Sequence, residues 1–155
     1  MNHLLLKEAT FKVEGIGNFW TLFKNDAQSL FYAEFENVPP HYHKHTEELF
    51  FILNGKATAT IGTNFSEYEG DSITEHYGIS DPITDKIKED IGYVWANRRI
   101  RDLGPNSSLR IKPYTPHMLE VKKAPLEVIL LNIPPIDKFN PIDDYSLPYP
   151  DKRFL

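Results

Sequence analysis

Three histidines and two glutamates lie within the eight residues from His41 to Glu48, directly before the apolar run 49–53. His41 and His43 are two positions apart, and alternate residues of a β-strand point to the same face of a sheet. Both imidazoles can therefore converge on one metal ion. Glu48 opens the apolar run and can add a carboxylate. Imidazole suits Zn, Cu, Fe and Ni, and an added carboxylate widens the choice toward Fe(II) and Mn.

The rest of the chain reads mainly as short strands. Asn54-Gly55 stands between two apolar stretches, which is a strong short-range signal for a β-hairpin, so we expect a hairpin there. Many short strands with turns between them are typical of a β-sandwich or barrel. Besides 49–53 and 56–61, the strands that we expect are 11–14, 19–24, 30–36, 65–68, 109–112, 118–121 and 126–133.

The histidine-rich stretch resembles the first sequence motif of the cupin family. That motif is His-x-His, three or four residues, Glu, six residues and Gly. Here the sequence reads His41-x-His43, four residues, Glu48, six residues and Gly55. The resemblance implies that His41, His43 and Glu48 are metal ligands.

Two neighbouring residues fit this motif less well. Glu47 would leave seven residues before the glycine, so Glu48 is the better ligand. His45 shares the parity of the two other histidines but stands only two residues before Glu48. The alternative to a metal site is an exposed polar loop rich in histidine.

The second cupin motif is roughly Gly, five residues, Pro-x-Gly, two residues, His, three residues and Asn, and it is matched more weakly. Gly70 supplies the first position, and the sequence Thr-Pro-His that ends at His117 supplies a common ending. Lys112, Tyr114 and Val121 stand where the family has proline, glycine and asparagine. By resemblance His117 is the fourth ligand. The alternative is a turn histidine that caps a strand.

The resemblance implies an all-β fold, the cupin-type double-stranded β-helix (jelly-roll) barrel, with one helical insert. A length of 155 residues favours one domain, so we expect a single cupin domain over 1–155. We expect an N-terminal arm over 1–10. Five prolines predict an extended C-terminal strap over 134–155.

The helical insert is expected over residues 72–108. Asp81-Pro82 has the form of a helix N-cap followed by proline at the first helical position, and isoleucines recur every four residues from Ile83. We therefore expect a helix from about Pro82 to about Ile100. The insert is either a lid over the pocket or an interface element. The basic cluster Arg98, Arg99 and Arg101 either ends this helix in solvent, as suits its dipole, or clamps an anion.

Three histidines and one glutamate leave one or two coordination positions of a metal ion free. Such an ion can polarise a substrate oxygen, or it can bind a substrate beside O₂. The family resemblance therefore implies a metal-dependent enzyme for a small oxygen-rich organic molecule, either a dioxygenase or an isomerase, epimerase or decarboxylase. The alternatives are a non-catalytic cupin that binds or senses a small ligand, and a purely structural metal site. The divalent ion expected is Fe, Mn, Ni or Zn.

Composition narrows the partners. The formal net charge is −5 without a long basic run, which argues against nucleic acid or an anionic membrane and leaves a small molecule. Cysteine is absent, so neither disulfides nor thiolate ligands are available. The apolar start is too short for a signal peptide, which favours the cytoplasm. The cupin resemblance implies a homodimer, with Leu4–Leu6 and the strand around Trp20 as candidate contacts.

Overall fold

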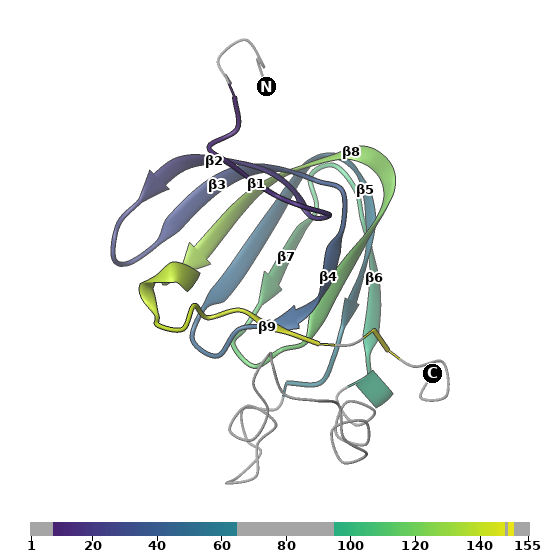
Figure 1. Ribbon diagram of the computed structural model, residues 1–155. Coiled ribbons are helices and arrows are strands. Elements are labelled where there is room, and N and C mark those ends of the chain that lie inside the picture. The colour runs from purple at the N-terminus through teal and green to yellow at the C-terminus, as the bar shows by residue number, and fades with distance from the viewer. Residues whose placement is uncertain (1–7, 65–94, 148, 151–155) are drawn as a thin grey trace, which may run out of the picture.

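The computed structural model describes residues 8–64, 95–147 and 149–150, and almost all regular structure in these ranges is β-strand. Every strand pairing is antiparallel, and the sheet curls into a half-barrel (Figure 1). The described residues contain no helix long and apolar enough to cross a membrane. The elements are β1 (Phe11–Val13), β2 (Gly17–Lys24), β3 (Ser29–Phe35), β4 (Val38–Tyr42), β5 (Glu47–Ile61), β6 (Arg99–Leu103), β7 (Ser108–Ile111), β8 (His117–Ile133), the 3-10 turn η2 (Ile136–Lys138) and β9 (Tyr145–Ser146).

Strands β5 and β8 are the two long strands around which the others are arranged. They pair along most of their length, from Glu47 opposite Ile133 to Ile61 opposite His117. Strand β3 pairs with the C-terminal half of β8, whereas β4 pairs with its N-terminal half. Strand β5 similarly pairs with β7 in its first half and with β6 in its second. Each long strand therefore belongs to both sides of the barrel.

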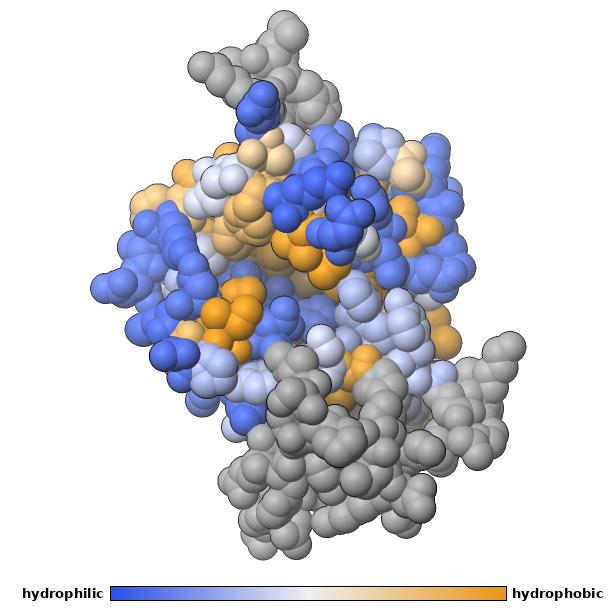
Figure 2. All heavy atoms as spheres, in the orientation of Figure 1, coloured by the Kyte–Doolittle hydropathy of each residue, from blue (hydrophilic) through white to orange (hydrophobic). Residues whose placement is uncertain are grey.

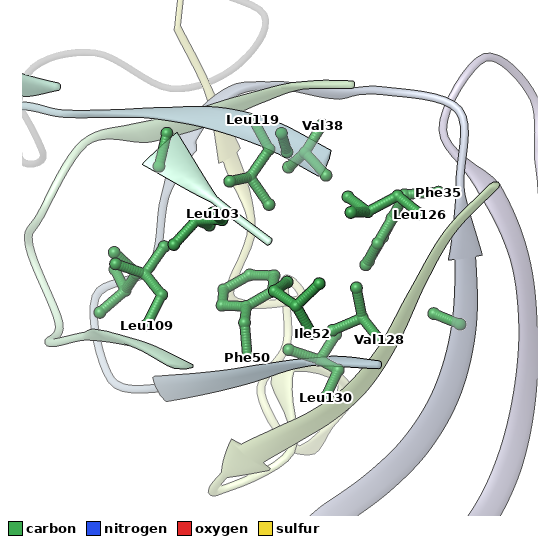
Figure 3. Close-up of a cluster of buried hydrophobic side chains, with 14 of the residues drawn as sticks. Phe35, Val38, Phe50, Ile52, Leu103, Leu109, Leu119, Leu126, Val128 and Leu130 are labelled. Carbon is green, nitrogen blue, oxygen red and sulfur yellow. The ribbon is translucent and has the colours of Figure 1, made fainter. Parts of the chain in front are cut away.

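The interior of the barrel is filled by alternate residues of these strands. The inward positions of β5 and β8 are apolar over most of their length, as the strict two-residue period of a half-buried strand requires. Figure 3 shows side chains from several strands pointing toward one another in this core. Buried members of the cluster include Phe35, Val38, Phe50, Ile52, Leu103, Leu109, Leu119, Leu126, Val128 and Leu130.

The expected hairpin at Asn54-Gly55 is wrong, because β5 runs through these residues without turning back. The pairing with β8 is irregular between Ile52 and Ala57, and Gly55 has a φ of +89°. A Cβ atom at Gly55 would lie only 2.3 Å from the carbonyl oxygen of Pro125. The glycine therefore serves a bulge where the two long strands cross closely, which needs the same positive φ as a tight turn.

The expected insert lies mostly outside the described residues. The strand 65–68 and the helix up to residue 94 cannot be compared with the structure for this reason. Residues 95 and 96 are helical, but Arg99–Leu103 forms β6 and pairs with β5. The helix therefore ends before Ile100, and Arg99 and Arg101 are exposed on a strand instead of ending a helix.

The segment 134–147, called the strap below, crosses the open side of the half-barrel (Figure 1). It contains η2 and β9, and β9 pairs with β4 through His41 and Tyr42. The Asp143 side chain is fully buried in this segment. Its carboxylate accepts hydrogen bonds from the backbone N–H groups of residues 44, 45 and 46 at 2.6, 2.8 and 2.8 Å. The strap thus holds the loop between β4 and β5.

The homodimer stays a prediction. The arm residues Leu4–Leu6 lie outside the described residues, so that candidate contact cannot be assessed. Strand β2, the other candidate, carries Leu22 and Phe23 with 48% and 47% of their surface exposed. Two adjacent exposed apolar side chains on one strand are compatible with a contact between subunits.

The hydrogen bonds of Asp143 give a testable prediction about stability. Replacing Asp143→Ala leaves three backbone donors without their acceptor, so we expect the free energy of unfolding to fall by about 1–3 kcal/mol. Urea denaturation followed by circular dichroism measures this change. Asp137→Ala is the matched control on the same strap, because Asp137 is exposed and forms a surface ion pair with Lys24, and such pairs contribute at most about 1 kcal/mol. Equal losses in the two variants would contradict the role of Asp143.

Candidate metal centre

Four side chains from three parts of the chain meet at one end of the barrel. His41 lies near the end of β4, His43 follows that strand, Glu48 is the second residue of β5 and His117 is the first residue of β8. His41 and His117 are direct cross-strand partners. The ligand atoms of the four residues all lie within 4.8 Å of one another. The structure therefore brings together the four residues that the cupin resemblance implied, although His43 stands just beyond the strand.

All three imidazoles face the same carboxylate oxygen. The Nε2 atoms of His43 and His117 lie 2.8 and 2.9 Å from Oε1 of Glu48. The Nε2 atom of His41 lies 3.7 Å from the same oxygen. Glu48, His43 and His117 are buried and His41 is half-buried, so bulk water does not screen this cluster fully.

The opposite nitrogen of each ring is fixed by a backbone carbonyl. Nδ1 of His41 donates to the carbonyl of Pro39 at 2.8 Å, and Nδ1 of His117 donates to that of Thr115 at 2.8 Å. Nδ1 of His43 donates to the carbonyl of Asp143 at 2.5 Å. A carbonyl can only accept, so the proton of each neutral ring stays on Nδ1. Each Nε2 then presents a lone pair to the centre, as a metal ligand must.

This arrangement requires a cation. Three lone pairs and an ionised carboxylate oxygen repel one another at these distances unless a positive charge lies among them. A proton on one ring can supply that charge, and so can a metal ion. Three nitrogens and one carboxylate oxygen suit Fe, Mn, Ni or Zn, so the donor set fits a divalent metal ion.

The pKa values show how the cluster holds a proton when no metal is bound. Burial opposes a charge on His43, but the carboxylate of Glu48 outweighs it and raises the pKa of His43 to about 9. Burial and the nearby His41 lower the pKa of His117 to about 4. Burial also opposes ionisation of Glu48, but His43 and the imidazole hydrogen bonds hold its pKa well below the usual range. At neutral pH one proton therefore lies on His43, and a metal ion would displace it.

The residues that the sequence analysis set aside lie elsewhere. Glu47 points away from the cluster and accepts a hydrogen bond from Nε of the exposed Arg110. His45 is exposed and stacks on Phe139, with ring centroids 4.6 Å apart. Tyr114 supports the site through its backbone, because its N–H donates to the carbonyl of His43 at 2.6 Å.

A cavity of about 480 Å³ opens beside the cluster, and His41, His43 and Glu48 line it. Figure 2 shows hydrophobic side chains gathered around a hollow on this face of the molecule. Most of the wall surface is apolar, and its polar members include Ser29, Asn132 and Asp144 besides the three ligand candidates. The apolar residues of the wall include Phe11, Val13, Ile16, Phe19, Phe31, Phe35, Val38, Phe50, Leu130 and Ile136.

Sequence reasoning missed three polar residues at this site. Asp143 supports His43 through its backbone carbonyl, and Asn132 and Asp144 line the cavity. Asn132 could have been noticed, because it is the one amide in the apolar run 128–133 and has the parity of the inward-facing residues. Asp143 and Asp144 carry no such signal, since their role depends on where the strap crosses the site.

No family model matches the sequence, and no curated protein matches it significantly. Solved structures do match. KdgF from Halomonas sp. is 14% identical, with a TM-score of 0.57 over 88% of this chain and 94% of that chain. Pac13 from Streptomyces, a nucleoside dehydratase, is 10% identical, with a TM-score of 0.55 over 92% of this chain and 87% of that chain.

A third likeness names the fold directly. The cupin domain of Cnp3 from Schizosaccharomyces pombe is 12% identical, with a TM-score of 0.51 over 81% of this chain and 69% of that chain. At such low identity these likenesses concern the fold. They confirm the fold that the family resemblance implied, an all-β, cupin-type double-stranded β-helix.

Proposed function

We propose that this chain is a metal-dependent enzyme that acts on a small, oxygen-containing organic molecule. The observation that carries the proposal is the position of the ligand set at the wall of a cavity. Structural metal sites are closed by their protein ligands, whereas catalytic sites keep a position open. His41, His43 and Glu48 face the cavity, so a molecule inside it can reach an ion that they hold.

The chemistry proposed is proton transfer assisted by a Lewis acid. A divalent ion bound here would polarise a substrate oxygen and make a neighbouring C–H bond more acidic. Asp144 lines the same cavity, and its Oδ1 atom is buried without a hydrogen-bond partner among the described residues. Its charge also acts on His43, so it lies near the cluster. A carboxylate oxygen without a hydrogen-bond donor is available to accept a substrate proton.

This carboxylate favours an isomerase or lyase over a dioxygenase. Isomerases and lyases need a base close to the polarised oxygen, whereas the dioxygenase alternative calls for O₂ beside the substrate and no such base. A non-catalytic binding module remains the second candidate, because a mostly apolar cavity of this size also suits a ligand that is only held.

The first prediction concerns metal content. His43→Ala and Glu48→Ala each remove one of four convergent ligands, so we expect both variants to lose most of their bound metal. His45→Ala and Glu47→Ala are matched controls from the same eight residues, and both should keep it. Elemental analysis after purification measures the outcome. If Glu47→Ala empties the site while Glu48→Ala does not, the assignment of the ligands is wrong.

The second prediction concerns the base. In D₂O, the metal-loaded protein should introduce deuterium next to the polarised oxygen of one or more compounds in a panel of hydroxy acids, keto acids and sugars, followed by NMR. Asp144→Asn should keep its metal and lose this exchange at least about a hundredfold. Glu120→Gln is the control and should exchange normally, because Glu120 is an exposed carboxylate that pairs with Lys122 and is not part of the cavity wall. O₂ consumption by the iron-loaded protein would instead support a dioxygenase, and binding without any turnover would support the binding module.

A further inference from the structure

Asn132 occupies an unusual place on the inner face of the sheet. It lies on β8 between Ser29 of β3 and Glu48 of β5, and both residues are its direct cross-strand partners. Cross-strand partners share a face, with Cβ atoms about 4.5–5.5 Å apart. The amide therefore stands immediately beside the carboxylate of the metal cluster, and Ser29, Asn132 and Glu48 all line the cavity.

The Asn132 side chain is buried, but its amide oxygen accepts no hydrogen bond from the described residues. Only 3% of its surface is exposed, and its Oδ1 atom has no hydrogen-bond partner among the described residues. The inward neighbours along β8, Leu130 and Val128, are apolar and buried. A leucine at position 132 would continue this pattern without an unpaired polar atom. The amide therefore destabilises the free protein, as expected of a group that finds its partner in a ligand.

The wall around Asn132 indicates the shape of that ligand. Phe19, Phe31, Phe35 and Phe50 lie on the side of the cavity formed by β2, β3 and β5, together with Leu130 of β8. These side chains contact carbon groups well and offer no hydrogen bonds. A polar group of the ligand is accordingly expected at the metal and at Asn132, with its carbon body against the phenylalanines.

Two other buried side-chain atoms in the described ranges, Trp95 Nε1 and Asp144 Oδ1, also lack hydrogen-bond partners. Neither of them accounts for the unpaired oxygen of Asn132. Trp95 Nε1 is not part of the cavity wall. Asp144 Oδ1 lines the cavity from the strap, and the proton-transfer proposal already uses it. Within the described part of the chain, Asn132 is thus the one side-chain amide with an unsatisfied buried oxygen, and it lies on the sheet face beside the cluster.

We propose that Asn132 is a specificity-determining residue whose Oδ1 accepts a hydrogen bond from a hydroxyl or amine of the ligand. The ligand class is a molecule with a metal-binding oxygen, a hydrogen-bond donor on the adjacent carbon and an apolar or aromatic body. This inference rests on the proposed metal site. The inference goes beyond the metal site because it names the side chain that distinguishes one ligand from another.

A matched pair of probes tests this directly. Mandelate carries a phenyl ring, a carboxylate and an adjacent hydroxyl, and phenylacetate is the same molecule without the hydroxyl. The Co(II)-loaded protein is titrated with each, and binding is followed by the visible spectrum of the ion. We expect the wild-type protein to prefer mandelate, and Asn132→Leu to reduce that preference about tenfold, the contribution of one buried hydrogen bond.

The controls separate a role in recognition from a role in folding. Asn132→Leu should keep its cobalt and unfold at the same or a higher temperature, whereas an amide needed for folding would lower the unfolding temperature. Asn132→Val is the second variant if leucine does not fit. Leu130→Ala should weaken both probes by similar factors and leave their ratio unchanged.

Three results would overturn the proposal. If Asn132→Leu keeps the full preference for mandelate, the metal alone detects the hydroxyl. If neither probe binds the cobalt-loaded protein, the ligand class is wrong. If the wild-type protein binds no cobalt, the proposed metal site fails and this inference fails with it, and the cobalt spectrum distinguishes that result from the other two.

Discussion

Three hydrogen bonds from imidazole Nδ1 atoms to backbone carbonyls determine what this site can do. They fix the proton of each neutral ring on the outer nitrogen and turn the lone pairs of His41, His43 and His117 toward one oxygen of Glu48. Four electron donors cannot stay this close without a cation among them. The protein solves this problem with one proton on His43 or with a metal ion, and the rest of the structure keeps the four donors in place.

The two long strands and the strap share that task. Strand β5 supplies Glu48 at its beginning, and β8 supplies His117 at its beginning and Asn132 near its end. Because the two strands pair along most of their length, these residues are fixed by the same ladder as the core. The strap fixes the loop after β4, which the sheet does not hold. The Asp143 carboxylate accepts three hydrogen bonds from backbone N–H groups of this loop, and the Asp143 carbonyl accepts one from His43.

The cavity combines a cluster that could hold a metal ion with a wall whose surface is mostly apolar, and this combination shapes the functional proposal. Two polar residues of the wall, Asn132 and Asp144, each have a buried oxygen without a hydrogen-bond partner among the described residues. A ligand bound here would be oriented by its polar end, which lies beside the metal and the two oxygens.

The sequence predicted the parts of the site that depend on local spacing. His41 lies in β4, His43 in the short loop after it and Glu48 at the start of β5, so their close spacing along the chain also keeps them close in space. Asp143 was not predictable, because it meets His43 from 100 residues away and nothing in its neighbourhood signals the contact. Asn54-Gly55 was misinterpreted because a positive φ serves a bulge as well as a hairpin, and only the pairing of β8 distinguishes them.

The predicted end of the helix near Ile100 was also wrong, again because of a contact with a distant part of the chain. Helical periodicity is a local property, but Arg99–Leu103 pairs with the second half of β5, and this long-range pairing outweighs it. The fold class itself was predictable, because repeated short strands and the motif spacing agree. Since the fold class is confirmed, the central claim of the account is that the four residues bind a metal ion.

Anomalous X-ray diffraction from crystals soaked with Co(II) or Zn(II) tests that claim most directly. The account predicts one strong peak about 2.0–2.2 Å from the Nε2 atoms of His41, His43 and His117 and from a carboxylate oxygen of Glu48. The three Nδ1 atoms should remain on their carbonyls. A crystal saturated with metal that shows no peak among these four residues, with Glu48 still in direct contact with His43, would contradict it.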